Sequence, residues 1–227
     1  MLKLYKNLSI TLFILLCFCN AAIATAPLFD NDNKNNLLDL QPLDETTEEK
    51  IDNLTNWITE QENKETKDKI VLSALYRTRG FYYEKENKTI KALSDYNTSL
   101  KYDANNLPTL KHIRRIKMLI YDYEGALIVA NKIIKLEPKD YENYTFRGYI
   151  YLMLKKYKQA IDDGTKSILL KNKNPEAFKM RGLAKMSSNQ KESGLQDIIY
   201  AKQQYYDLGL YEDYQKTLKM YNDLIKR

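Results

Sequence analysis

A 34-residue repeat constrains the fold of this chain more than any other feature of its sequence. Small residues recur at that period as Ala92, Ala126, Ala160 and Gly194. A fixed period of this length is typical of arrays of helix–turn–helix units. One such unit cannot bury its apolar face alone, so neighbouring units stack and share a continuous core. The period therefore predicts an elongated array of helix pairs.

Three further columns of residues follow the same period. Gly80, Gly148 and Gly182 form one of them, with Arg114 at the equivalent place in the second repeat. Glycine inside a helix is destabilising by about 1 kcal/mol relative to alanine, so its recurrence needs a packing reason. We expect both columns of small residues to lie where two helices cross closely. The remaining columns are Tyr76, Leu110, Tyr144 and Phe178, and Ser99, Ile133, Ser167 and Ala201.

This pattern resembles that of the tetratricopeptide repeat family. Repeat three (141–174) carries the resemblance through Tyr144, Gly148, Tyr151, Ala160 and Ser167. Repeat one (73–106) matches through Tyr76, Gly80, Tyr83, Ala92 and Tyr96. The family pattern is weaker in repeat two (107–140), where Arg114 and Lys117 replace a small and an aromatic residue. Repeat four (175–208) has Lys185 in place of the aromatic residue.

The resemblance implies an all-α fold, an α-solenoid of antiparallel helix pairs with four repeats. The stretch 209–227 follows the fourth repeat and places Tyr214, Leu218, Tyr221 and Ile225 at helical spacing. We interpret it as the capping helix that a repeat array needs at an open end.

The segment 1–26 has the order of a secretory signal peptide. Lys3 and Lys6 precede an apolar run over 10–19, and small residues cluster over 21–26. Cleavage after Ala24 would remove residues 1–24, so we expect an exported protein, periplasmic or secreted. The alternative is an uncleaved membrane anchor over 8–26, which is barely long enough to span a bilayer. Both cysteines lie in this segment, so the mature chain has no thiol for a disulfide.

Charge is distributed unevenly along the chain. Residues 27–66 carry a net charge of −8, and residues 67–227 carry +12. The stretch 25–45 is too polar to bury a core, and we interpret it as a flexible acidic arm. An amphipathic helix follows within 46–66, with Thr46 as its cap and Ile51, Leu54, Trp57 and Ile58 at helical spacing. The opposite charges suggest that the arm competes with partners for the basic body.

No residues in the sequence form a catalytic constellation. His112 is the single histidine, so no second histidine or mature cysteine completes a metal site or a nucleophile–base pair. The phosphate-binding and nucleophile-elbow motifs are also missing from the sequence. We therefore predict that the chain is not an enzyme and needs neither a cofactor nor a metal.

The resemblance implies that the first helix of each repeat lines a concave groove, with its fifth and ninth positions facing a ligand. Those positions hold Arg77, Phe81, Lys111, Arg115, Thr145, Tyr149, Lys179 and Leu183. Cations mixed with aromatic and apolar surface suit a peptide or helix of a partner protein with some negative charge. Some family members grip a C-terminal carboxylate with a fixed set of residues. The matching places here hold Arg77, Phe81, His112, Glu142 and Phe146, which breaks that carboxylate clamp.

Two function classes follow from these features. The first is an exported scaffold or adaptor that binds a peptide or helix of another protein. The alternative is binding of nucleic acid or another polyanion, which the charge of +12 over residues 67–227 suggests. The basic residues are spread around the helices and many have acids three or four positions away. Together with the export segment, this spread favours a protein partner.

Overall fold

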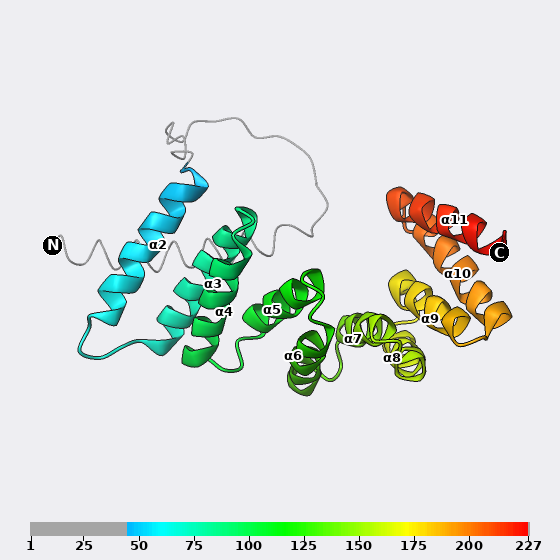
Figure 1. Ribbon diagram of the computed structural model, residues 1–227, viewed down its shortest axis with the longest axis horizontal. Helices are drawn as coiled ribbons and strands as arrows, with labels where there is room; N and C mark the ends of the chain where they lie inside the picture. The colour runs from blue at the N-terminus through cyan, green and yellow to red at the C-terminus, as the bar shows by residue number, and fades with distance from the viewer. Residues whose placement is uncertain (1–44, 227) are drawn as a thin grey trace, which may run out of the picture. The chain divides into compact units, whose positions relative to one another are not determined.

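The structure, a computed structural model, describes residues 45–226, and in that range it contains helices and no strand (Figure 1). The all-α fold is thereby confirmed. The helices are α2 (Thr47–Glu62), α3 (Lys69–Lys85), α4 (Thr89–Tyr102), α5 (Leu107–Leu119), α6 (Tyr123–Leu136), α7 (Tyr141–Met153), α8 (Tyr157–Leu170), α9 (Pro175–Ser187), α10 (Lys191–Asp207) and α11 (Tyr211–Ile225). The predicted signal peptide, the alternative anchor and the acidic arm up to residue 44 lie outside the described residues. Within 45–226, no helix has the length and apolarity needed to cross a membrane.

The backbone repeats with the same period as the sequence. The helices α4, α6, α8 and α10 begin at Thr89, Tyr123, Tyr157 and Lys191, which hold the same place in the four repeats. The turn before each of them contains one residue in the left-handed region: Asn87, Tyr121, Lys155 and Asn189, with φ of 56°, 62°, 57° and 64°. The period is therefore visible in the conformation of the turns as well as in the places where the second helices begin.

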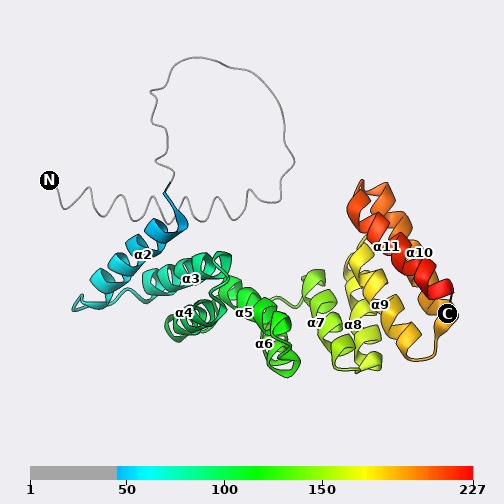
Figure 2. The ribbon, with the colours of Figure 1, turned by 45° about the horizontal axis from the view of Figure 1, so that its top comes forward.

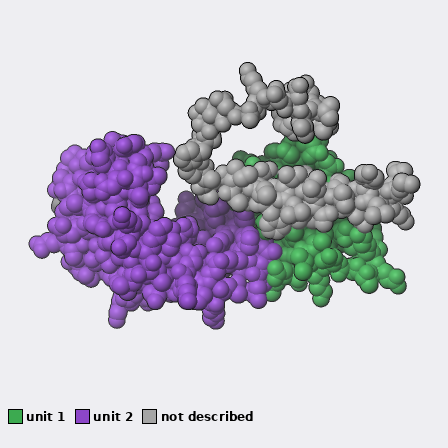
Figure 3. Space-filling model, turned by 180° about the vertical axis from the view of Figure 1, so that it is seen from behind, with its two compact units in different colours: residues 1–104 green, residues 105–227 purple. Residues whose placement is uncertain are grey.

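The chain divides into two compact units, residues 1–104 and 105–227 (Figure 3). In the described part of the first unit, α2 packs against α3 and α3 against α4. Leu54 and Ile58 of α2 are buried against Leu75 of α3. The predicted cap is present, because the amide of Glu49 donates to Oγ1 of Thr46 at 3.2 Å and its carboxylate accepts from the Thr46 amide at 2.8 Å.

In the second unit, every helix from α5 to α11 packs against the next one along the chain, as the ribbon in Figure 2 shows. The first helices of the last two repeats, α7 and α9, also contact each other directly. This arrangement of sequential pairs plus contacts between first helices is the one expected for a solenoid of helical repeats.

Small residues lie at the close helix crossings, as the sequence predicts. A Cβ atom added to Gly182 of α9 would lie 2.7 Å from the carbonyl oxygen of Gly194 in α10. No side chain fits at that distance, so both positions require glycine or a shift of the backbone. Ala126 and Ala160 occupy the equivalent crossings of repeats two and three and are fully buried.

An arginine–aspartate pair recurs in three of the four repeats. Arg147 of α7 donates through Nε and Nη2 to both carboxylate oxygens of Asp163 in α8, each at 2.7 Å, and through Nη1 to Asn131 of α6 at 2.9 Å. We call this arrangement the arginine tie, because it joins a helix pair to the preceding helix. The equivalent pairs are Arg79 with Asp95 and Arg181 with Asp197. Repeat two has Ile113 and Val129 at these places.

The capping helix α11 packs on α10 with a face slightly different from the predicted one. Tyr214, Leu218 and Tyr221 are half-buried, as expected. Ile225 is 53% exposed, however, and Thr217 is the buried residue of the helix. The sequence pattern missed Thr217 because a hydroxyl-bearing side chain does not count as apolar in a helical spacing.

Candidate functional site

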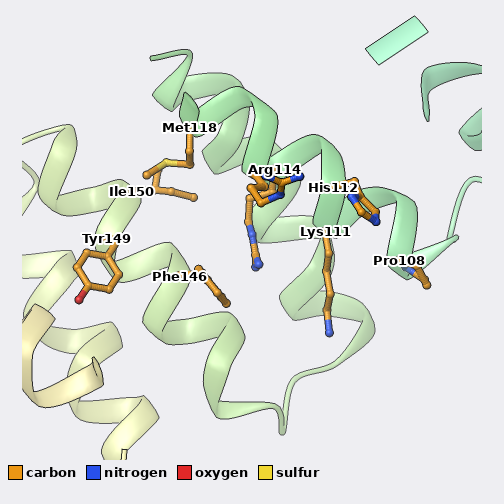
Figure 4. Close-up of a pocket in the computed structure, with 9 residues that line it drawn as sticks. Pro108, Lys111, His112, Arg114, Met118, Phe146, Tyr149 and Ile150 are labelled. Carbon is orange, nitrogen blue, oxygen red and sulfur yellow. The ribbon is translucent and has the colours of Figure 1, made fainter. Parts of the chain in front are cut away.

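An open cavity of about 640 Å³ lies in the second unit, between the first helices of repeats two and three. Figure 4 shows Lys111, His112 and Arg114 reaching it from α5, and Phe146, Tyr149 and Ile150 from α7. The remaining lining residues are Pro108, Arg115 and Met118. The cavity thus combines cationic side chains with a wall that is mostly aromatic and aliphatic, the mixture typical of ligand-binding sites.

Three of the predicted groove residues meet at this cavity: Lys111, Arg115 and Tyr149. Lys111 is paired within the protein, because its Nζ lies 3.2 Å from Glu137 and 3.6 Å from Asp140. Arg115 is exposed. The charge that the cavity presents to a ligand is therefore smaller than the number of its basic residues suggests.

Arg114 is the unusual member of the lining. Its side chain is only 6% exposed, although it carries a guanidinium group. Its Nη1 is buried and has no hydrogen-bond partner among residues 45–226. Burial lowers the pKa of Arg114 to about 10, against the opposing influence of Asp140 and Glu142, so the group is charged at neutral pH. Buried donors without a partner are rare in folded proteins.

Phe146 forms the opposite wall of the cavity. Its ring centroid lies 4.0 Å from Cζ of Arg114, a stacking distance for a cation on an aromatic face. The ring is nevertheless 46% exposed, so part of it is available to a partner. The sequence places Phe146 among the residues of the broken carboxylate clamp, and the structure places it beside Arg114 instead.

Tyr149 and Lys179, both predicted groove residues, meet at a carboxylate that the sequence reasoning missed. Tyr149 donates to Glu176 at 2.6 Å, Lys179 donates to it at 2.6 Å, and Tyr205 of α10 donates to it as well. Burial alone would raise the pKa of Glu176, but these three donors together hold it below its usual value. The cluster fixes the tyrosine ring at the end of the cavity. No spacing within one helix identifies it, because its members come from three helices.

The other predicted groove residues lie elsewhere. Thr145 is buried, and its hydroxyl is engaged with Ser167 at 2.8 Å and with Asn174 at 3.0 Å, so it holds helices together rather than facing solvent. Leu183 lines a separate cavity of about 400 Å³ formed by α9, α10 and α11. Arg77 and Phe81 belong to α3 of the first unit, where the Phe81 ring is 37% exposed.

His112 lies at the edge of the cavity. Among residues 45–226, no group of three or more His, Cys, Asp or Glu side chains is arranged to hold a metal ion. The cavity thus has an aromatic and aliphatic lining with a buried guanidinium in its wall.

Comparison with known proteins identifies the architecture. No family model and no curated protein matches this chain. Solved structures do match: the MamA RS-1 ArsTM double mutant has a TM-score of 0.63 at 15% identity, over 72% of this chain and 87% of that one. A tetratricopeptide repeat protein from Parabacteroides merdae has a TM-score of 0.63 at 16% identity, over 77% and 72%.

A further match is the TPR2B domain of yeast Sti1, in a structure described as a complex with pHsp70. Its TM-score is 0.50 at 17% identity, over 53% of this chain and 96% of that domain. Similarity at these identities concerns the fold and not the ligand. The period, the helix pairs and these matches together show that the chain has the tetratricopeptide-repeat fold.

Proposed function

We propose that this chain is a scaffold that binds a peptide or a helix of another protein at the cavity between α5 and α7. The cavity carries the proposal, because it joins a buried cation to an exposed aromatic ring on the first helices of two neighbouring repeats. Repeat folds use such surfaces to hold extended segments. The match to a Sti1 domain in complex with pHsp70 supports a protein partner.

The basic charge supports nucleic-acid binding less well. Arg79, Arg147 and Arg181 are each bound to an aspartate through two nitrogens, which removes them from the surface available to phosphates. Binding to random-sequence DNA should therefore be weak at an ionic strength of about 0.15 M. Tight binding under that condition would favour the polyanion alternative.

The test of the proposed function is a selection from a displayed random peptide library on the purified full-length protein. Selected peptides, labelled with a fluorophore, are then titrated against variants by fluorescence anisotropy. We expect Phe146→Ala to weaken binding at least about tenfold, the effect of removing a well-placed aromatic anchor. Lys158→Ala, an exposed residue of α8 outside the cavity, is the control. Peptides that bind both variants equally would place the binding surface elsewhere.

We also propose that the protein is exported. The order of charges, apolar run and small residues over 1–26 supports this. Fractionation of cells and the N-terminal sequence of the purified protein test it. A mature chain that begins at Thr25 supports cleavage, whereas an intact N-terminus in the membrane fraction supports the anchor.

A further inference from the structure

Arg114 occupies a place in the repeat where the other repeats have glycine. Gly80, Gly148 and Gly182 are its equivalents in repeats one, three and four. At Gly148 of α7, an added Cβ would lie 2.2 Å from the terminal methyl group of Met180 in α9. The glycine therefore leaves the space that the end of the Met180 side chain occupies. In repeat two, the same place holds a long cationic side chain.

Phe146, which faces Arg114, is the counterpart of Met180 one repeat earlier. Phe146 and Met180 hold the same place in consecutive repeats, and the Phe146 ring lies on the Arg114 guanidinium. Met180 is fully buried, whereas Phe146 is 46% exposed. Between α7 and α9, Gly148 and Met180 fill the helix crossing. At the equivalent place between α5 and α7 there is instead an open cavity with a guanidinium at its wall.

The guanidinium is incompletely satisfied. Nη1 of Arg114 has no hydrogen-bond partner in the part of the chain that the structure describes, and the residue is buried. Lys111, which also lines the cavity, is already neutralised by Glu137 and Asp140. Arg114 lines the cavity and therefore brings to its wall one charged donor, the buried Nη1, that no described residue uses. Hydrogen bonds from a charged donor are about twice as strong as neutral ones.

We propose that the cavity binds an acidic side chain of a partner peptide, Asp or Glu, whose carboxylate accepts from the buried Arg114 guanidinium while a neighbouring apolar side chain packs on Phe146. The proposal rests on the function proposed above and specifies its ligand. A carboxylate fits better than a phosphate group, because Glu137, Asp140 and Glu142 lie near the cations and would repel a dianion.

The experiment is a double-mutant cycle on the full-length protein. The probes are the peptides from the random library and their counterparts in which each Asp or Glu is replaced by its amide. The protein variants are Arg114→Met, which replaces the guanidinium by an uncharged side chain, Arg114→Lys, and the control Lys158→Met. Thermal unfolding followed by circular dichroism establishes that each variant is folded.

We expect the selected peptides to share an acidic residue beside an apolar one. Replacing that acid by its amide should weaken binding to the wild-type protein about 10- to 100-fold, the range for one charge-assisted hydrogen bond. Arg114→Met should weaken the binding of the acidic peptide by the same factor. With this variant, replacing the acid by its amide should cause no further loss of affinity. Arg114→Lys should retain part of the affinity, and Lys158→Met all of it.

Two results would overturn this inference while leaving the proposed function intact. One is a set of peptides that bind at the cavity without an acidic residue in common. The other is an acid-to-amide penalty of the same size in Arg114→Met as in the wild-type protein. A library that yields no binder at all would instead contradict the proposed function, and the inference with it.

Discussion

The junction between α5 and α7 differs from the junction between α7 and α9, although equivalent places in the repeat meet at both. Between α7 and α9, Gly148 and the fully buried Met180 close the crossing. Between α5 and α7, Arg114 and the half-exposed Phe146 leave a cavity of about 640 Å³. One backbone period thus accommodates both a closed and an open junction.

The comparison shows that the two junctions differ in both residues that meet there: glycine and a buried methionine at one, arginine and a half-exposed phenylalanine at the other. Repeat two differs in a second respect, because it has Ile113 and Val129 where the other repeats have the arginine tie. It therefore lacks this polar link to its neighbours and gains a buried cation. Because of these two differences, stability measurements on variants that exchange residues between repeat two and repeat three should show what each feature contributes to folding, apart from any role in binding.

The largest effect on stability is expected when the arginine of the open junction is placed at the glycine position of the closed junction. Gly148→Arg brings a Cβ to within 2.2 Å of Met180 and buries a charge without a partner. Overpacking and an unpaired buried charge together should lower the free energy of unfolding by more than about 4 kcal/mol. Urea denaturation measures the loss. Gln159→Arg, at an exposed place on α8, adds the same charge and should leave the midpoint unchanged.

A smaller effect is expected when the arginine tie of repeat three is removed. The hydrogen bonds to Asp163 raise the pKa of Arg147, whereas burial raises the pKa of Asp163 against the influence of Arg147, so the buried carboxylate depends on its partner. Arg147→Met leaves Asp163 buried without its partner and should lower the free energy of unfolding by about 3 kcal/mol. The double change Arg147→Ile with Asp163→Val introduces the residues of repeat two. It should lower the free energy of unfolding by less than the single change does. A double variant that is no more stable than Arg147→Met would show that the tie is more than a buried ion pair.

The smallest effect has the opposite sign. Arg114→Met removes the buried Nη1, which has no partner among the described residues, so we expect it to raise the free energy of unfolding by about 1 kcal/mol. The same urea experiment measures it, with the peptide absent. A loss of stability would mean that the stacking of the guanidinium on Phe146 outweighs its incomplete hydrogen bonding.

The fold follows from the sequence because packing and turns obey the same period. The small residues at the helix crossings, the Thr46 cap and the helix pairs all depend on local spacing, which the sequence displays directly. The arginine tie also has a sequence signal, since Arg147 and Asp163 are 16 residues apart and the pair recurs in three repeats. Its members are charged, however, so a pattern of apolar residues does not reveal it.

The candidate site was less predictable, because its properties depend on contacts between repeats. The sequence identified Arg114 as a departure in packing, but only the structure shows that its Nη1 is buried without a partner. Thr145 occupies a predicted groove position, yet its hydroxyl bonds to Ser167 and Asn174, and this bonding depends on the angle between helices. The pairing of Lys111 with Glu137 likewise joins residues that are far apart in the sequence.

The left-handed turns have a consequence for how such a chain changes length. Tyr121 and Lys155 have nearly the same backbone conformation, with φ of 62° and 57°, at equivalent points of consecutive repeats. Removing residues 122–155 would join Tyr121 directly to Lys156 and leave one turn of the same geometry in place of two. The two ends of a whole repeat therefore have matching backbone conformations. The array can be shortened or extended by one repeat while every turn keeps the same geometry.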